Sequence, residues 1–96
     1  MKVEGCGKPL GSKLICVSAE VVNLEGLPVV ESLALRGDFF ALPEEGFDEG
    51  EASLHAVPLA GLAEAFDAAM LTRGVRLLGI SGREVEDILR RALLES

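Results

Sequence analysis

Polar and apolar residues alternate along residues 13–23, KLICVSAEVVN. Successive side chains of a β-strand point to opposite faces, so this alternation predicts a strand with one face in the core. The face that we expect to be buried holds Ile15, Val17, Ala19 and Val21. Three of these residues are β-branched, which favours the same structure.

A second apolar run covers residues 28–40 and follows turn-forming residues at 23–26, NLEG. Two such runs joined by a turn predict an antiparallel hairpin. In the second run we expect two alternating faces, one with Val29, Glu31, Leu33 and Leu35, the other with Val30, Ser32 and Ala34. The sequence KPLGS at 8–12 predicts another turn, so residues 2–6 are expected to add a short edge strand.

Apolar residues recur at helical spacing in the C-terminal half. We expect Pro58 to open a helix that Gly74 ends, with an apolar stripe at Leu59, Leu62, Ala63, Phe66, Ala69 and Met70. Another helix is expected to start at Ser81, because Ser81 and Glu84 have the spacing of a capping box. Its core stripe would be Val85, Ile88, Leu89 and Ala92.

The middle segment, residues 43–56, is acidic and contains Gly46 and Gly50. Each glycine weakens a helix by about 1 kcal/mol, so we predict a poor helix or an ordered loop. Taken together, the patterns predict one α+β domain, residues 1–96. In it, a small antiparallel sheet of two or three strands is packed by two or three helices.

Composition narrows the classes of partner. The 96 residues carry 16 acidic and 9 basic side chains and a net charge of -7, which does not suit a nucleic acid. No apolar run reaches the roughly 18 residues that span a membrane, and residues 1–4 do not resemble a signal peptide. We expect a cytoplasmic protein. The absence of Gln and the single Asn suit a thermophilic source.

Catalytic motifs are not found in the sequence. It lacks the nucleotide-binding, zinc-protease and serine-hydrolase signatures, so we assign no catalytic residue and expect no activity from this chain alone. His55 is expected to be structural or solvated, and the acidic residues at 44–51 to form a solvated face rather than a metal site. Cys6 and Cys16 are expected to be two reduced, partly buried thiols, although heat-adapted organisms do form intracellular disulfides.

One stretch, LRGDFFALPEE at 35–45, holds two of the four phenylalanines side by side. Neighbouring strand residues point to opposite faces, so Phe39 and Phe40 cannot both enter one core unless the strand bends. Gly37 and Asp38 are suited to such a bend. Either both rings cap the core against the helices, or one of them anchors a protein interface.

Three pieces of the chain in order, KPLGSKLICV at 8–17, LRGDFFALPEE at 35–45 and GISGREVEDIL at 79–89, resemble the C-terminal accessory domain of lipoate-protein ligases. The family pattern has a basic turn, a Gly-Asp-Phe-Phe that closes a strand, and a Gly-Ile-Ser before the last helix. In that family the domain is either fused behind a catalytic domain or made as a separate small subunit. Because this chain begins with its own Met and contains nothing else, it resembles the separate kind.

This resemblance implies a partner, the large catalytic subunit of the ligase, which holds ATP, Mg and lipoate. No cofactor would be bound by this chain alone. Its role would be to help form lipoyl-AMP, before the lipoyl group passes to lysines of lipoyl-acceptor domains. Gly37, Asp38, Phe39 and Phe40 would form an interface or a structural motif. Lys8 and Lys13 are candidates for a contact with phosphate or with an acidic patch of the partner.

The chain departs from the family pattern in two places. Ser12 precedes Lys13 where the family usually has Gly-Lys, and Gly46 and Gly50 stand where a helix would be expected. Two other functions stay open. A scaffold of the iron-sulfur-assembly type would need Cys6 or Cys16 as an exposed thiolate, and a homo-oligomeric structural protein would place one of the paired phenylalanines in its own interface.

Overall fold

The computed structural model describes residues 1–8 and 14–95. In chain order the elements are β1 (Lys2–Gly7), β2 (Ile15–Leu24), β3 (Leu27–Gly37), β4 (Phe40–Leu42), α1 (Glu44–Ala52), β5 (Val57–Pro58), the 3-10 helix η1 (Leu59–Gly61), α2 (Leu62–Thr72), β6 (Arg76–Leu78) and α3 (Gly82–Glu95). The α+β class is confirmed. The predicted number of strands is too low, because the described residues form a sheet of four strands and a separate pair.

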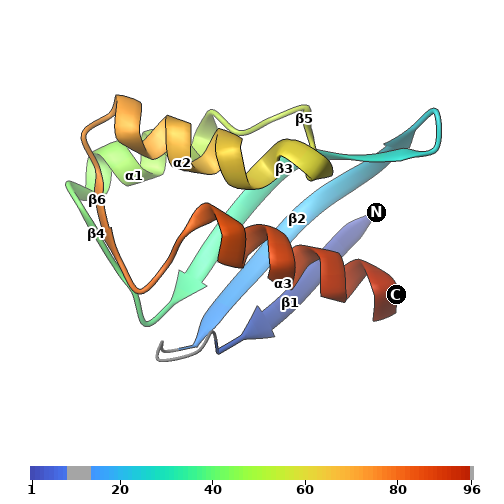
Figure 1. Cartoon of the computed structure of the whole chain (residues 1–96), viewed down its shortest axis with the longest axis horizontal. Helices are drawn as coiled ribbons and strands as arrows, with labels where there is room; N and C mark the ends of the chain where they lie inside the picture. The colour runs from blue at the N-terminus through green and yellow to red at the C-terminus, as the bar shows by residue number, and fades with distance from the viewer. Residues whose placement is uncertain (9–13, 96) are drawn as a thin grey trace.

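The main sheet has the strand order β1-β2-β3-β5 and is antiparallel. The predicted hairpin is confirmed as β2 and β3, whose tip has positive φ at Glu25 and Gly26. β1 pairs with β2 as the predicted edge strand. Helices α2 and α3 lie side by side over one face of this sheet (Figure 1). The other face of the strands carries mainly polar residues.

A β-bulge changes the predicted faces of β3. Glu20 pairs with Ser32 but the next residue, Val21, pairs with Val30, which leaves Glu31 as an extra residue. The simple alternation expected for this strand is therefore wrong. Because the bulge shifts the side-chain phase by one residue, Val30 enters the core together with Leu33 and Leu35, while Glu31 is exposed.

The core lies between the sheet and the two helices. The predicted buried face of β2 is confirmed, with Ile15, Val17, Ala19 and Val21 all at most 5% exposed. The stripe of α3 is confirmed as well, since Val85, Ile88, Leu89 and Ala92 are buried. From α2 come the fully enclosed side chains of Leu62, Phe66 and Met70. Pro58 belongs to β5 rather than to the helix, which starts at Leu62 after η1.

Helices α2 and α3 cap each other. Gly82 at the start of α3 donates its backbone N–H to Asp67 Oδ1 of α2 over 2.9 Å, and Ala63 near the start of α2 donates to Glu86 Oε1 of α3 over 3.0 Å. Both carboxylates thus accept from the free N–H groups of a neighbouring helix. Within the predicted capping box, the Glu84 N–H donates to Ser81 Oγ, and the Ser81 hydroxyl donates to Glu84 Oε1.

The acidic middle segment forms α1, so the helical alternative is the right one. Its glycines lie on the face that meets the rest of the molecule. A Cβ on Gly46 would come within 2.9 Å of Val75 Cγ2, and one on Gly50 within 3.0 Å of the Met70 side chain. Glycine at these two positions lets α1 approach Met70 of α2 and Val75, which follows α2, more closely than a larger residue would allow.

Candidate functional site

The stretch that contains the paired phenylalanines leaves the main sheet and forms a second, smaller one. β4 pairs only with β6, with Phe40 opposite Leu78, Ala41 opposite Leu77 and Leu42 opposite Arg76. We call this pair the β4–β6 ribbon. Figure 1 places it at one end of the molecule, next to α1.

Gly37 and Asp38 make the bend that separates the ribbon from β3. Gly37 has φ +145°, and a Cβ there would collide with the backbone of Leu14, whose carbonyl oxygen lies against the glycine. That same carbonyl accepts a hydrogen bond of 2.9 Å from the backbone N–H of Asp38. Only glycine fits both the backbone angle and the space, so the bend depends on this residue.

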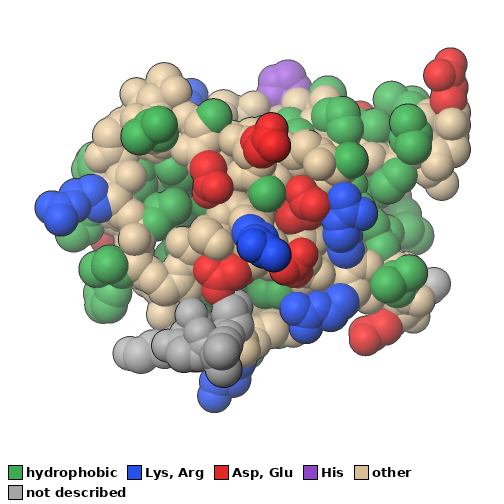
Figure 2. Space-filling view, in the orientation of Figure 1, with side chains coloured by type: hydrophobic (Ala, Val, Ile, Leu, Met, Phe, Trp, Pro, Cys, Tyr) green, Lys and Arg blue, Asp and Glu red, His purple; other side chains and the backbone are tan. Residues whose placement is uncertain are grey.

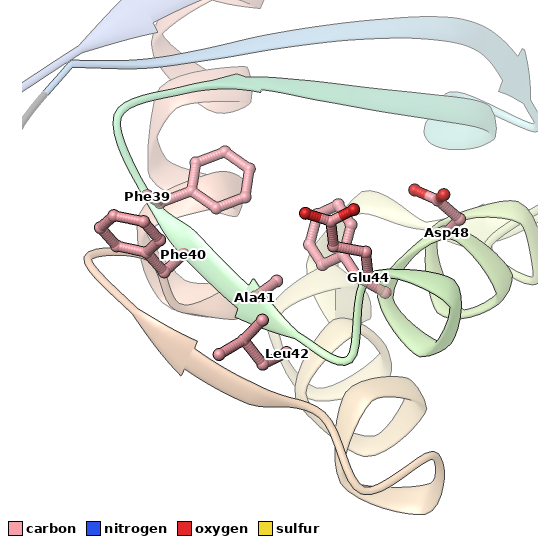
Figure 3. A pocket seen from close by; sticks show the side chains of 7 residues that line it. Phe39, Phe40, Ala41, Leu42, Glu44 and Asp48 are labelled. Carbon is pink, nitrogen blue, oxygen red and sulfur yellow. The ribbon is translucent and has the colours of Figure 1, made fainter.

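Beyond the bend, the two phenylalanines occupy different surroundings. Phe39 is half-buried, packs against the core, and has its ring 5.5 Å from that of Phe47 on α1, at an interplanar angle of 47°. Phe40 is 65% exposed. Figure 3 shows Phe39 directed toward α1, with Phe40 on the other side of the strand. Each phenylalanine therefore serves a different surface.

A groove of about 340 Å³ lies between β4 and α1. Phe39 and Phe47 belong to its apolar wall, and Glu44 and Asp48 supply its carboxylates. These two acidic residues are four positions apart on α1 and so share one face of the helix. Figure 3 shows both carboxylates on α1, with Asp48 further along the helix from the phenylalanine rings than Glu44. We call this hollow the acidic groove.

The outer face of the ribbon is apolar. Residues at i and i+2 share a face of a strand, as do cross-strand partners, so Phe40, Leu42 and Leu78 point outward together. They are between 59% and 68% exposed. Arg76, opposite Leu42, is the cation of this face. Figure 2 shows apolar side chains open to solvent at this end of the molecule.

Of the two basic candidates, only Lys8 belongs to the described residues, and it is not among the residues that line the groove. Lys8 is exposed and follows β1, whose last pair aligns Gly7 with Ile15, which is itself paired with Gly37. Lys8 is therefore placed at the same end of the main sheet as Gly37 and Asp38. Lys13, the other predicted contact, lies outside the described residues.

The cysteines are joined, so the prediction of two reduced thiols is wrong. Cys6 and Cys16 face each other across β1 and β2, and their Sγ atoms are bonded. Neither can serve as a thiolate in this state, which removes the basis for an iron-sulfur-type scaffold. Among the described residues no group of three or more His, Cys, Asp or Glu side chains is arranged to hold a metal. His55 is exposed.

Two glutamates have shifted pKa values. Burial raises the pKa of Glu51, against the lowering effect of a 2.9 Å hydrogen bond from the Leu35 N–H, and nearby Asp48 raises it further. Burial also raises the pKa of Glu86, but the hydrogen bond from Ala63 and the ion pair with Arg90 outweigh this effect, so the pKa is lowered overall. Both side chains accept backbone hydrogen bonds between elements, so they hold the fold together.

Sequence reasoning missed the second strand of the ribbon. Residues 76–78, RLL, form β6 in the short segment between Gly74 and Gly79, but a run of three paired residues gives too short a pattern to identify alone. Leu42 and Leu78 were missed for the same reason. The signal that could have found them is a pair of short runs, FAL and RLL, each followed by a turn residue.

The comparisons with known proteins point to one fold. No protein-family model and no curated protein matches this chain. A solved structure does, described as an archaeal lipoylation system from Thermoplasma acidophilum, a bi-partite lipoate protein ligase and its E2 lipoyl domain. This chain is 22% identical to a chain of that structure, with a TM-score of 0.67, and the match covers 94% of this chain and 96% of that one. The two chains share a fold and are of similar length.

No helix among the described residues is both long and apolar enough to cross a membrane.

Proposed function

We propose that this chain is the accessory subunit of a two-component lipoate-protein ligase. The observation that carries the proposal is the end-to-end likeness in fold to a chain of a bi-partite ligase system, together with the Gly-Asp-Phe-Phe bend that the sequence resemblance rests on. The partner would be the large catalytic subunit, in whose site ATP, Mg and lipoate are bound. Lipoyl-acceptor domains would be indirect partners, and the pair would work in the cytoplasm.

In this proposal the subunit contributes conformation rather than a catalytic side chain. Formation of lipoyl-AMP develops charge on the transferring phosphoryl group, which must meet preorganised donors in a site closed to water. A small domain that braces the large subunit in its closed form promotes this step without touching the reacting atoms. The subunit would therefore act on the activation half-reaction.

The test is the release of pyrophosphate from ATP and lipoate by the large ligase subunit of the same genome, with and without this chain. We expect strong stimulation by an equimolar amount. A large subunit that makes lipoyl-AMP at full rate by itself would contradict the proposal.

A second measurement distinguishes the accessory subunit of a ligase system from its lipoyl-acceptor domain. If this chain were the acceptor, a lysine of its own would become lipoylated, and its lysines are Lys2, Lys8 and Lys13. A variant with all three replaced by arginine keeps the charges and removes every acceptor amine. We expect this variant to stimulate activation as the natural chain does, and mass spectrometry to find the lipoyl group on the separate acceptor domain.

A further inference from the structure

We propose that the outer face of the β4–β6 ribbon and the acidic groove together form the surface that holds the large ligase subunit. The partner segment that fits it carries a lysine or arginine next to large apolar side chains. This inference rests on the proposed function and adds to it the location of the contact and the chemistry of the segment.

The apolar part of the surface is the ribbon. Phe40, Leu42 and Leu78 are adjacent on one face of a two-stranded sheet whose strands have three residues each. Side chains of this size that gather on one face, rather than being scattered, mark an interaction site. An exposed aromatic ring in such a patch is the kind of residue that dominates the energy of an interface.

The polar part is the acidic groove. The residues that line it include Glu44 and Asp48 but no basic side chain. Within the described residues, neither carboxylate takes part in an ion pair. A cation that enters the groove would therefore meet two uncompensated carboxylates and the aromatic ring of Phe39, which also attracts cations.

The two parts are continuous because they share β4. Phe40 and Leu42 belong to the outer face of the ribbon and also line the groove, which opens between β4 and α1 (Figure 3). One segment of a partner can thus cover the ribbon with apolar side chains and place a basic side chain in the groove. The net charge of -7 favours encounter with a basic surface.

The experiment measures binding of the natural chain and its variants to the large subunit by titration calorimetry, with pyrophosphate release as a second readout. The apolar variant is Phe40→Ser with Leu78→Ser, and the charge variant is Glu44→Lys with Asp48→Lys. The matched control is Leu94→Ser, because Leu94 is 86% exposed near the C-terminal end of α3, at the opposite end of the molecule from the ribbon (Figure 1). Thermal unfolding of each variant confirms that it is folded.

We expect the Kd of the apolar variant to rise at least tenfold, the loss typical of central interface anchors. The charge variant should bind more weakly and should lose the salt dependence of the natural complex. Leu94→Ser should bind as the natural chain does.

Other results overturn the inference in distinguishable ways. If the natural chain binds and stimulates and both variants do the same, the contact lies elsewhere while the proposed function stands. If the natural chain neither binds the large subunit nor stimulates it, the inference and the proposed function are both contradicted. If light scattering shows a dimer of this chain that Phe40→Ser with Leu78→Ser dissociates, the ribbon is an interface between copies and the inference is wrong.

Discussion

Phe66 and Phe40 represent two differently built regions of this molecule. Phe66, on α2, is completely enclosed between the helix pair and the main sheet, whereas Phe40, on the ribbon, is 65% exposed. The first region is held by apolar burial and by hydrogen bonds between its helices. The second directs its large side chains outward. The contrast suggests that the helix-covered sheet provides the stability and that the ribbon is available for recognition.

The strongest test of this contrast is Phe66→Ala. The change leaves a cavity in the centre of the core and is expected to cost about 3 to 5 kcal/mol of unfolding free energy. Urea unfolding followed by circular dichroism measures the loss. A loss below about 1 kcal/mol would mean that the helix pair does not carry the stability of the fold.

A smaller effect on stability is expected from loss of the disulfide between β1 and β2. Replacing Cys6 and Cys16 together by serine should cost about 2 to 3 kcal/mol, because the unfolded chain is no longer cross-linked. Comparison of unfolding with and without a dithiol reductant provides the control. The natural chain should be destabilised by the reductant and the double variant should not respond.

Glu86→Gln tests the capping between the helices. The pKa of Glu86 is lowered in the folded state, so its carboxylate contributes stability above its usual pKa of 4.5 and loses that contribution as the pH falls through the lower folded value. The substitution should lower the free energy of unfolding by about 1 kcal/mol at neutral pH. It should also remove the loss of stability that protonation of Glu86 causes at acid pH.

Glu51→Gln is the matched control for the acid titration. Because the pKa of Glu51 is raised, its contribution is present at low pH and is lost as the pH rises through the folded value, the opposite sign. Between about pH 7 and about pH 3, the pH-dependent part of the stability difference from the natural chain should therefore have opposite signs in the two variants. Equal responses would show that one of these pKa shifts is misassigned.

The smallest effect on stability is expected for Phe40→Ala. Its ring is exposed, so the unfolding free energy should change by less than about 0.5 kcal/mol. Phe39→Ala should be clearly more destabilising, because that ring packs against Phe47 and the core. Equal large losses from both changes would contradict the division of the two phenylalanines between two surfaces.

Much of the main fold could be predicted from periodicity. The buried face of β2 and the stripe of α3 follow the two-residue and helical repeats that burial on one side imposes. The bulge at Glu31 could not be predicted, since one extra residue changes the phase without changing the composition. The helix at α1 was obscured because Gly46 and Gly50 have low helix propensity, while close packing against Val75 and Met70 requires glycine at these positions.

The candidate site was predictable only in part. The adjacency of Phe39 and Phe40 behind Gly37 indicated a bend and two surfaces, which is a local property of the chain. The groove also depends on α1, whose glycines obscured the helix, and the apolar face depends on β6, which comes from a distant part of the sequence. The disulfide was missed because two cysteines ten positions apart show their pairing only when the strand register brings Cys6 opposite Cys16.

The hydrogen bond from Leu35 to Glu51 has a consequence for assembly. On the outer side of β3, β5 covers only Val29 and Val30, and the Glu51 carboxylate accepts the Leu35 N–H further along the strand. A foreign strand is hindered from joining the sheet there, so within the described residues β1 is the longer edge strand that pairs on one side only. Two copies joined through β1 would leave no such edge, and growth by strand pairing would stop at a pair rather than continue into a fibre.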